Sequence, residues 1–168
     1  MKLRRSAAPL AFILLSSSLL LVAQQMEHSA PATPSTQLTI KTYEGKTLTL
    51  SPSELAALPH KTVAVFNAHT KAQEQYAGVP LADLLAKVGV PAGEDVRGKL
   101  FLVGIVASGT DGYGVLYSLA EVDPAIHTGD VIVADTLDGQ KLSKDGAFKM
   151  VSSEERRPAR WCRCASSA

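Results

Sequence analysis

The N-terminal segment of this chain limits most strongly what the remainder can fold into. Three basic residues in the first five positions precede an apolar run over residues 7–23, AAPLAFILLSSSLLLVA. A short basic region followed by an apolar run of this kind is typical of a secretory signal peptide. An uncleaved membrane anchor is the alternative, because the run is close to the shortest length that spans a bilayer. We expect cleavage after Ala23, or later near residues 30–32.

The leader also indicates the route of export. Arg4 and Arg5 form a twin-arginine pair, but Ser6-Ala7-Ala8 replaces the large apolar pair that normally follows such arginines, and the apolar run is rich in leucine. We therefore expect the general secretory route of bacteria, in which the chain crosses the membrane unfolded. The mature protein is then periplasmic or secreted, with no membrane span after cleavage. An unfolded chain does not carry a cofactor that was assembled in the cytoplasm.

The rest of the chain divides into a linker, one domain and a tail. Residues 24–36, QQMEHSAPATPST, are rich in Pro, Ser, Thr and Ala, which predicts a disordered linker. Residues 37–164 are enough for one domain with its own hydrophobic core and too few for two. Residues 165–168 are expected to be a short tail.

The charge balance excludes one class of partner. The sequence has 17 Lys and Arg residues and 16 Asp and Glu residues, and removal of the leader leaves 14 against 16. Binding to nucleic acid needs a clustered basic excess. The basic cluster of this chain lies only at its far end, at Arg156, Arg157, Arg160 and Arg163. We therefore expect no nucleic-acid partner.

Cysteine usage argues against a disulfide framework. Export leads to an oxidising compartment, yet Cys162 and Cys164 are the only cysteines of the chain. A bridge between residues so close in sequence is strained. We interpret them as small buried residues or free thiols, with a redox or metal pair and an intermolecular bridge as alternatives. No second Cys/His pair has the spacing of a zinc site.

Hydrophobic periodicity and turn residues predict short elements in the first half of the domain. Alternating apolar residues predict a hairpin over residues 38–50. Ser51 and Glu54 form a capping box for a short helix that ends at Leu58. The other predicted elements are a strand over 62–66, a loop or irregular hairpin over 67–75, an extended segment over 76–79 in which Gly78 permits a sharp turn, and a helix from Pro80 to Gly89.

The second half reads as strands separated by turns. The apolar run over residues 100–107 predicts a central strand, and residues 113–119 predict its partner. Further predicted elements are one or two helical turns over 120–126, a buried strand over 131–134, a turn over 137–140 and a strand over 147–152. Strands and short helices thus alternate without a regular βαβ pattern, which favours an α+β fold with a mixed sheet or barrel-like core. The sequence lacks the phosphate-binding, serine-hydrolase and zinc-protease motifs.

An ordered set of motifs resembles one family. The segments are YAGVPLADLL at 76–85 with VGV at 88–90, ASGTDGY at 107–113, IVAD at 132–135 with Asp138-Gly139, GAFKMV at 146–151 and RRPARW at 156–161. Their order resembles the molybdopterin-binding oxidoreductase domain of sulfite oxidases, in a minimal, stand-alone and exported form. The resemblance implies the fold of that domain and makes molybdopterin the candidate cofactor.

The residue types at one position of the resemblance depart from the catalytic members of the family. Those members hold molybdenum through a cysteine thiolate in the stretch after the strand that is here 63–66. This sequence has Asn67-Ala68-His69-Thr70-Lys71 there, and no cysteine between Met26 and Trp161. Ala or Thr does not replace a soft thiolate ligand, and a lone histidine such as His69 is usually exposed. We therefore expect no bound cofactor.

The basic C-terminal residues are the remaining candidate site. Arginine suits bidentate capture of phosphate or carboxylate and stacks on aromatic rings. The candidate ligand-binding residues are His69, Lys144, Arg157, Arg160 and Trp161. The alternative is a solvated strand end that forms salt bridges with Glu154 and Glu155.

Three hypotheses of function follow from these observations. The first is a cofactor-free module that binds a small anionic ligand or a periplasmic protein partner. The second is a molybdopterin-dependent oxidoreductase that binds its cofactor without a protein thiolate. The third is a purely structural interaction domain without a ligand. The missing cysteine favours the first, and no catalytic residue is assigned.

Overall fold

The computed structural model describes residues 33–143 and 146–154 of the chain. The strands are β1 (Leu38–Lys41), β2 (Thr47–Leu50), β3 (Lys61–Asn67), β4 (Ala72–Pro80), β5 (Gly104–Ser108), β6 (Gly114–Ser118), β7 (Val131–Leu137), β8 (Gln140–Lys141) and β9 (Lys149–Ser152). The helices are α1 (Pro52–Ala56), α2 (Leu81–Lys87) and α3 (Leu119–Val122), with 3-10 turns η1 (Gly93–Asp95) and η2 (Gly98–Leu102). None of the described helices has the length and hydropathy of a transmembrane span.

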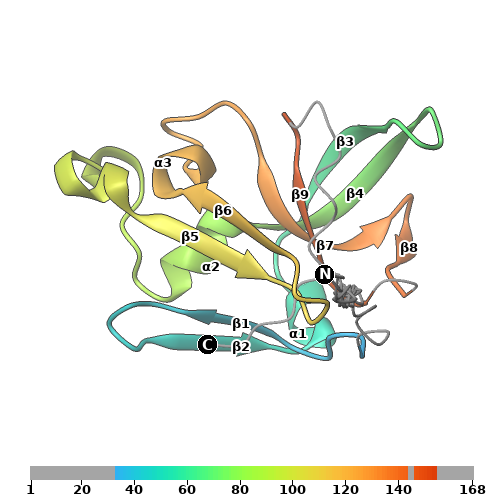
Figure 1. Ribbon diagram of the computed structural model, residues 1–168, viewed down its shortest axis with the longest axis horizontal. Helices are drawn as coiled ribbons and strands as arrows, with labels where there is room; N and C mark the ends of the chain where they lie inside the picture. Colours follow the sequence, from blue (N-terminus) through green and yellow to red (C-terminus); the bar gives the residue numbers. More distant parts are fainter. Residues whose placement is uncertain (1–32, 144–145, 155–168) are drawn as a thin grey trace, which may run out of the picture.

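The largest sheet is built around β7 (Figure 1). This strand pairs with β4, β8 and β9, and β4 also pairs with β3; all of these pairs are antiparallel. The first five residues of β7 are buried. Val131 and Val133 belong to one hydrophobic cluster, whereas Ile132 and Ala134 belong to a second one. Because neighbouring residues of a strand point to opposite faces, β7 separates two cores.

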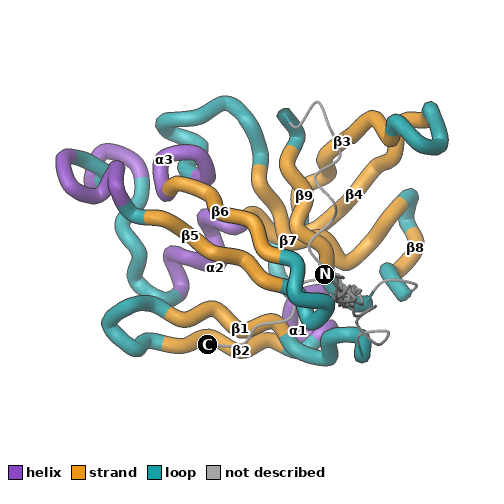
Figure 2. The backbone as a smooth tube through the Cα atoms, viewed as in Figure 1, coloured by secondary structure: helices purple, strands orange, loops and turns teal. Residues whose placement is uncertain are grey.

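Two hairpins stand apart from this sheet. β1 pairs with β2 and β5 pairs with β6, each as a two-stranded antiparallel sheet. The tube in Figure 2 shows both hairpins on the same side of the molecule as α2, away from β3, β4 and β8. Their buried side chains join those of α2 and β7 in the larger core. The hairpins therefore add a second layer on one face of the main sheet.

The short helices are held by their ends. Ser51 and Ser118 each accept a hydrogen bond from the backbone of a glutamate three residues later, and each glutamate accepts one in return. These are capping boxes, which satisfy backbone donors that a short helix leaves open. The sequence predicted the first of them. Gly89 follows the C-cap residue of α2 and has a φ of 79°, a conformation that glycine adopts without strain.

Gly78 lies where β4 and β7 approach each other most closely. The register of the pair shifts between Ala77 and Gly78. A Cβ atom at position 78 would overlap the carbonyl oxygen of Val133 and the backbone of Ala134. The absence of a side chain is therefore needed for strand pairing, and not for the sharp turn into α2 that the sequence had indicated.

One predicted element is confirmed in one of its two alternatives, and another differs from the structure. Residues 67–75 belong to a hairpin and not to a loop, because residues 68–71 form a tight turn that leads directly into β4. Gln73 and Gln75 are exposed on that strand, so their polarity reflects one solvated face. Residues 100–107 are not a central strand, because residues 98–102 form η2 and β5 begins only at Gly104.

The exposed side chains explain why the central strand predicted over residues 100–107 is wrong. Leu102 is 85% exposed and Val106 is 75% exposed. β5 pairs with β6 among the described residues and presents one face to solvent. A continuous apolar run thus did not imply burial on both faces. The predicted α+β class with short helices is confirmed, and the described sheets do not close into a barrel.

Replacing Gly78 tests the close contact between β4 and β7. We expect Gly78→Ala to lower the free energy of unfolding by about 2–4 kcal/mol, because the added Cβ must displace the β7 backbone. The matched control is Gly114→Ala in β6, where the nearest atom to an added Cβ is the Ala107 carbonyl oxygen at 3.7 Å. Urea denaturation measures both, and equal losses would contradict the explanation.

Candidate functional site

A cavity of about 610 Å³ lies between the two hairpins and the main sheet. We call it the hairpin groove. Its lining comes from β1 and its turn (Leu38, Thr39, Ile40, Lys41, Thr42, Tyr43, Glu44, Lys46), from α2 and the segment after it (Leu81, Leu85, Val88, Gly89, Val90, Pro91), from η2 to β5 (Leu100, Val103, Gly104, Ile105, Val106, Ala107, Ser108), and from Leu119, Val133 and Met150. The volume is in the range of sites that enclose a drug-sized ligand, about 300–1,000 Å³.

The floor of the hairpin groove is apolar and rigidly placed. Leu81 and Leu85 project from one face of α2, and both are buried. Val133 of β7 lies opposite Met150 of β9, and the two residues are 1% and 5% exposed. Since these residues belong to the packed core around β7, the floor is as ordered as the core itself. A ligand that enters would bury apolar surface here.

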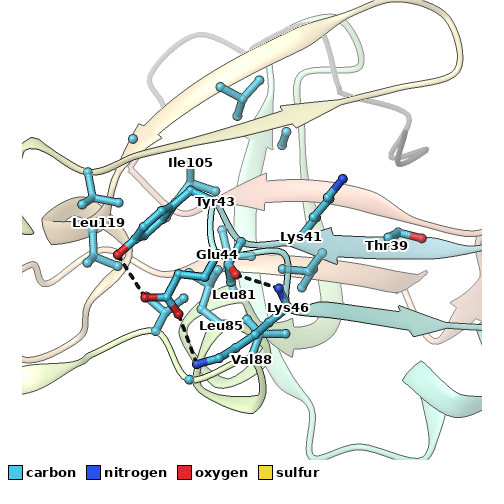
Figure 3. A pocket seen from close by; sticks show the side chains of 18 of the residues that line it. Thr39, Lys41, Tyr43, Glu44, Lys46, Leu81, Leu85, Val88, Ile105 and Leu119 are labelled. Carbon is cyan, nitrogen blue, oxygen red and sulfur yellow. Dashed lines mark hydrogen bonds and ion pairs between the residues drawn. The ribbon is translucent and has the colours of Figure 1, made fainter. Parts of the chain in front are cut away.

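Polar side chains gather at one end of the groove, in the turn between β1 and β2 (Figure 3). The Tyr43 hydroxyl donates to Glu44 Oε1 at 3.2 Å, and Glu44 Oε2 lies 3.4 Å from Lys46 Nζ. Tyr43 lines the groove and is 93% exposed, so its ring lies at the opening of the groove to solvent. Lys46 Nζ also lies against Gly89 after the end of α2, where a cation is favourable. Lys41 lies further along β1, outside this cluster.

Both strands that border the groove present an edge to it. All four residues of β1 and all five residues of β5 line the cavity. Alternate residues of a strand point to opposite faces. An unbroken run of lining residues therefore means that the strand meets the cavity along its edge, with backbone groups as well as side chains. The groove runs between β1 and β5.

Of the candidate ligand-binding residues predicted from the sequence, the structure describes His69, which does not line the hairpin groove. His69 lies in the turn between β3 and β4, where its side chain is exposed and its backbone N–H donates to Asn67 Oδ1 at 2.9 Å. That turn is at the end of the main sheet away from the hairpins. Lys144, Arg157, Arg160 and Trp161 lie outside the described residues. The structure therefore leaves these four predictions open.

The stretch in which catalytic members of the resembled family place their thiolate is a short turn in this chain. Asn67 of β3 pairs directly with Ala72 of β4, so only residues 68–71 connect the strands. No described residue is a cysteine, and residues 33–143 and 146–154 contain no group of three His, Cys, Asp or Glu side chains that could hold a metal. The described donor set does not fit a molybdenum–thiolate centre.

The groove residues were missed because no single one carries a chemical signal. The sequence showed Tyr43, Glu44 and Lys46 only as a turn, and the leucines of α2 only as core. The feature that indicates a groove is that residues 38–50 and 104–118 form separate hairpins, since the strands of an isolated hairpin have unpaired edges. The sequence does not show this feature, because it depends on which strands pair.

A second polar contact links the loop after α1 to β7. His60 Nδ1 lies 2.6 Å from the Leu58 carbonyl oxygen, and Nε2 lies 3.1 Å from each Asp135 carboxylate oxygen. Both partners are acceptors, so the protonated imidazole, with hydrogen on both ring nitrogens, satisfies both contacts. Burial lowers the pKa of His60, but the hydrogen bonds to Leu58 and Asp135 and the charge of Asp135 together raise it above the ordinary value of 6.5.

This contact predicts a pH-dependent contribution to stability. A raised folded-state pKa stabilises the fold below the unfolded pKa, and this contribution is lost as the pH rises through the folded value. We expect His60→Gln to cost about 1 kcal/mol near pH 5.5 and much less near pH 8.5. Urea denaturation across this range, with His69→Gln in the exposed turn as control, measures the difference. A cost that stays constant or grows with pH would contradict it.

A third polar cluster lies on the opposite face of the main sheet. Lys149 Nζ donates to the Tyr76 hydroxyl at 2.7 Å, and this hydroxyl donates to Glu74 Oε2 at 2.8 Å. Asn67 Nδ2 donates to the other Glu74 oxygen at 2.6 Å. Tyr76 is 1% exposed. The cluster joins β3, β4 and β9 and satisfies the polar end of a buried ring.

Comparison with known proteins supports the fold. No protein-family model matches the sequence, and no curated protein matches it. Among solved structures, the sulfane dehydrogenase SoxCD from Paracoccus pantotrophus superposes with a TM-score of 0.53 at 22% identity. The match covers 74% of this chain but 36% of that chain, so the chain spans about a third of its length. The chain therefore has the sulfite-oxidase-like fold that its ordered motifs predicted.

Proposed function

We propose that this protein is an exported, cofactor-independent binding module, and that the hairpin groove is its binding site. The small anionic ligand or protein partner expected from the sequence would bind between the two hairpins. The apolar floor would supply most of the affinity, and the polar turn of β1–β2 would orient the ligand. Export by the general secretory route places this binding in the periplasm or outside the cell.

The groove itself is the observation that carries the proposal. It combines a core-anchored apolar floor with a small number of polar groups at one end, as binding sites for organic ligands commonly do. A structural domain without a ligand would gain nothing from leaving such a volume open, because filling it would add buried apolar surface. The geometry thus favours binding over a purely structural role.

A molybdopterin-dependent oxidoreductase is the second candidate. The fold shared with a sulfane dehydrogenase favours it. Against it stand the four-residue connection after β3 and the confinement of both cysteines to positions 162 and 164. Those thiols lie far along the chain from the stretch in which the family places its ligand.

Metal analysis separates the two candidates. We expect the full chain, purified from a host that makes the molybdenum cofactor, to contain molybdenum only at the background level of a host protein without a cofactor. Mass spectrometry of the elements measures the ratio of metal to protein. Stoichiometric molybdenum would overturn the proposal in favour of the oxidoreductase, and its loss in Cys162→Ser or Cys164→Ser would identify a thiolate ligand.

A bulky residue in the groove tests the site. Ile105 is half-buried and lines the cavity from β5. We expect Ile105→Trp to weaken binding of the fluorescent probe anilinonaphthalene sulfonate by about tenfold, because the indole would occupy the probe's volume. Leu116→Trp is the matched control, since Leu116 lies on the same hairpin, 67% exposed and outside the lining. Equal binding by both variants with unchanged far-UV circular dichroism would contradict the site.

A further inference from the structure

Given the binding function proposed above, we infer that the ligand of the hairpin groove is an extended peptide of a partner protein, which adds as a strand to the edge of β1 that no strand of residues 33–143 and 146–154 pairs with. The groove is long, apolar at its floor and bordered by strand edges. A small compact ligand would use the floor alone. An extended peptide would use the floor and the backbone groups of the edge together.

The hydrogen-bond pattern of the first hairpin shows which backbone groups face the groove. At its turn, the Thr42 N–H donates to the Lys46 carbonyl oxygen at 2.9 Å. Antiparallel ladders alternate hydrogen-bonded and non-hydrogen-bonded pairs. Ile40 therefore bonds Leu48, whereas Thr39 and Lys41 direct their N–H and C=O groups away from β2. Four backbone groups are thus aligned along the groove.

The side chains confirm this reading of the edge. Thr39 Oγ1 lies 3.3 Å from Thr49 Oγ1 on the outer face of the hairpin, so the Thr39 side chain does not point to the core. Thr39 and Lys41 nevertheless line the groove. They do so through the edge of β1, where an incoming strand would meet N–H donors and C=O acceptors at the spacing of a sheet.

The floor determines the kind of peptide. Side chains of an added strand alternate between its two faces. One set would contact the floor at Leu85, Val133 and Met150, which favours residues such as valine, isoleucine and leucine. The other set would face the mouth beside the charged turn. The partner segment is therefore an extended stretch in which apolar and polar residues alternate.

The remaining parts of this chain do not have that pattern. Residues 155–168, ERRPARWCRCASSA, and residues 24–32, QQMEHSAPA, contain no stretch of alternating large apolar residues. The apolar run of residues 7–23 is continuous and belongs to the leader expected to be removed. A segment of another protein is the occupant that fits.

The first test uses a short synthetic peptide of alternating valine and threonine with glutamate at both ends, titrated against the full mature chain by calorimetry. Two further peptides carry N-methyl groups on either the odd or the even residues. N-methylation removes backbone donors and leaves every side chain. We expect the two methylated peptides to differ by about tenfold or more in affinity, because only one set of residues in an added strand directs its N–H groups to β1.

The second test changes the protein. Thr39→Pro removes the N–H that faces the groove and leaves the bonds between β1 and β2 intact. Thr49→Pro is the matched control, because Thr49 pairs with Thr39 and directs its N–H to the far edge of β2. We expect Thr39→Pro to weaken binding of the parent peptide by about tenfold, and Thr49→Pro to leave it unchanged.

The outcomes separate the peptide from the groove. If both methylated peptides bind alike, or if both proline variants do, strand addition is wrong. If the fluorescent probe still requires an open groove while no peptide binds, the binding module stands and the peptide inference falls. If the chain dimerises in sedimentation and Thr39→Pro prevents this, the occupant is a second copy and not a partner. If neither probe nor peptide binds, both proposals fall together.

Discussion

The two-sided burial of β7 is the constraint on which the rest of this structure depends. β7 pairs with three strands, and its side chains enter a hydrophobic cluster on each face. The register of such a strand is strongly specified, because a shift by one residue would move every side chain to the opposite face. The close approach at Gly78 adds a second restriction, since no larger residue fits against the β7 backbone. The main sheet therefore has one arrangement, and the groove inherits its rigid floor from it.

The features of this chain that bear on function lie at strand edges and in the connections between strands. The fold is shared with a sulfane dehydrogenase, and the connection between β3 and β4 in this chain is a turn whose residues are exposed. The hairpins on the other side leave an apolar cavity with strand edges along it. A scaffold can keep its core and exchange the loops that carry function. The hairpin groove is the part of this chain in which we propose that a ligand binds.

Much of the fold was predictable because its signals are local. The hairpin over 38–50, the capping box at Ser51, the helix after Pro80 and the buried strand that became β7 each follow from residue patterns within one element. Residues 100–107 misled because an apolar run indicates burial without indicating on which face or against what. The groove could not be predicted, because its walls come from residues 38–46, 81–91 and 103–108, which meet only in space.

The sequence by itself determined the class of fold, the order of its elements and the absence of a thiolate before residue 162. These depend on residue type and on spacing along the chain. The tertiary structure alone decided that His69 lies on an exposed turn, that His60 meets Asp135, and that the edge of β1 borders a cavity. The edge of a strand is open when no neighbouring strand pairs with it. No local pattern records it, because it is set by the packing of two hairpins against α2 and β7.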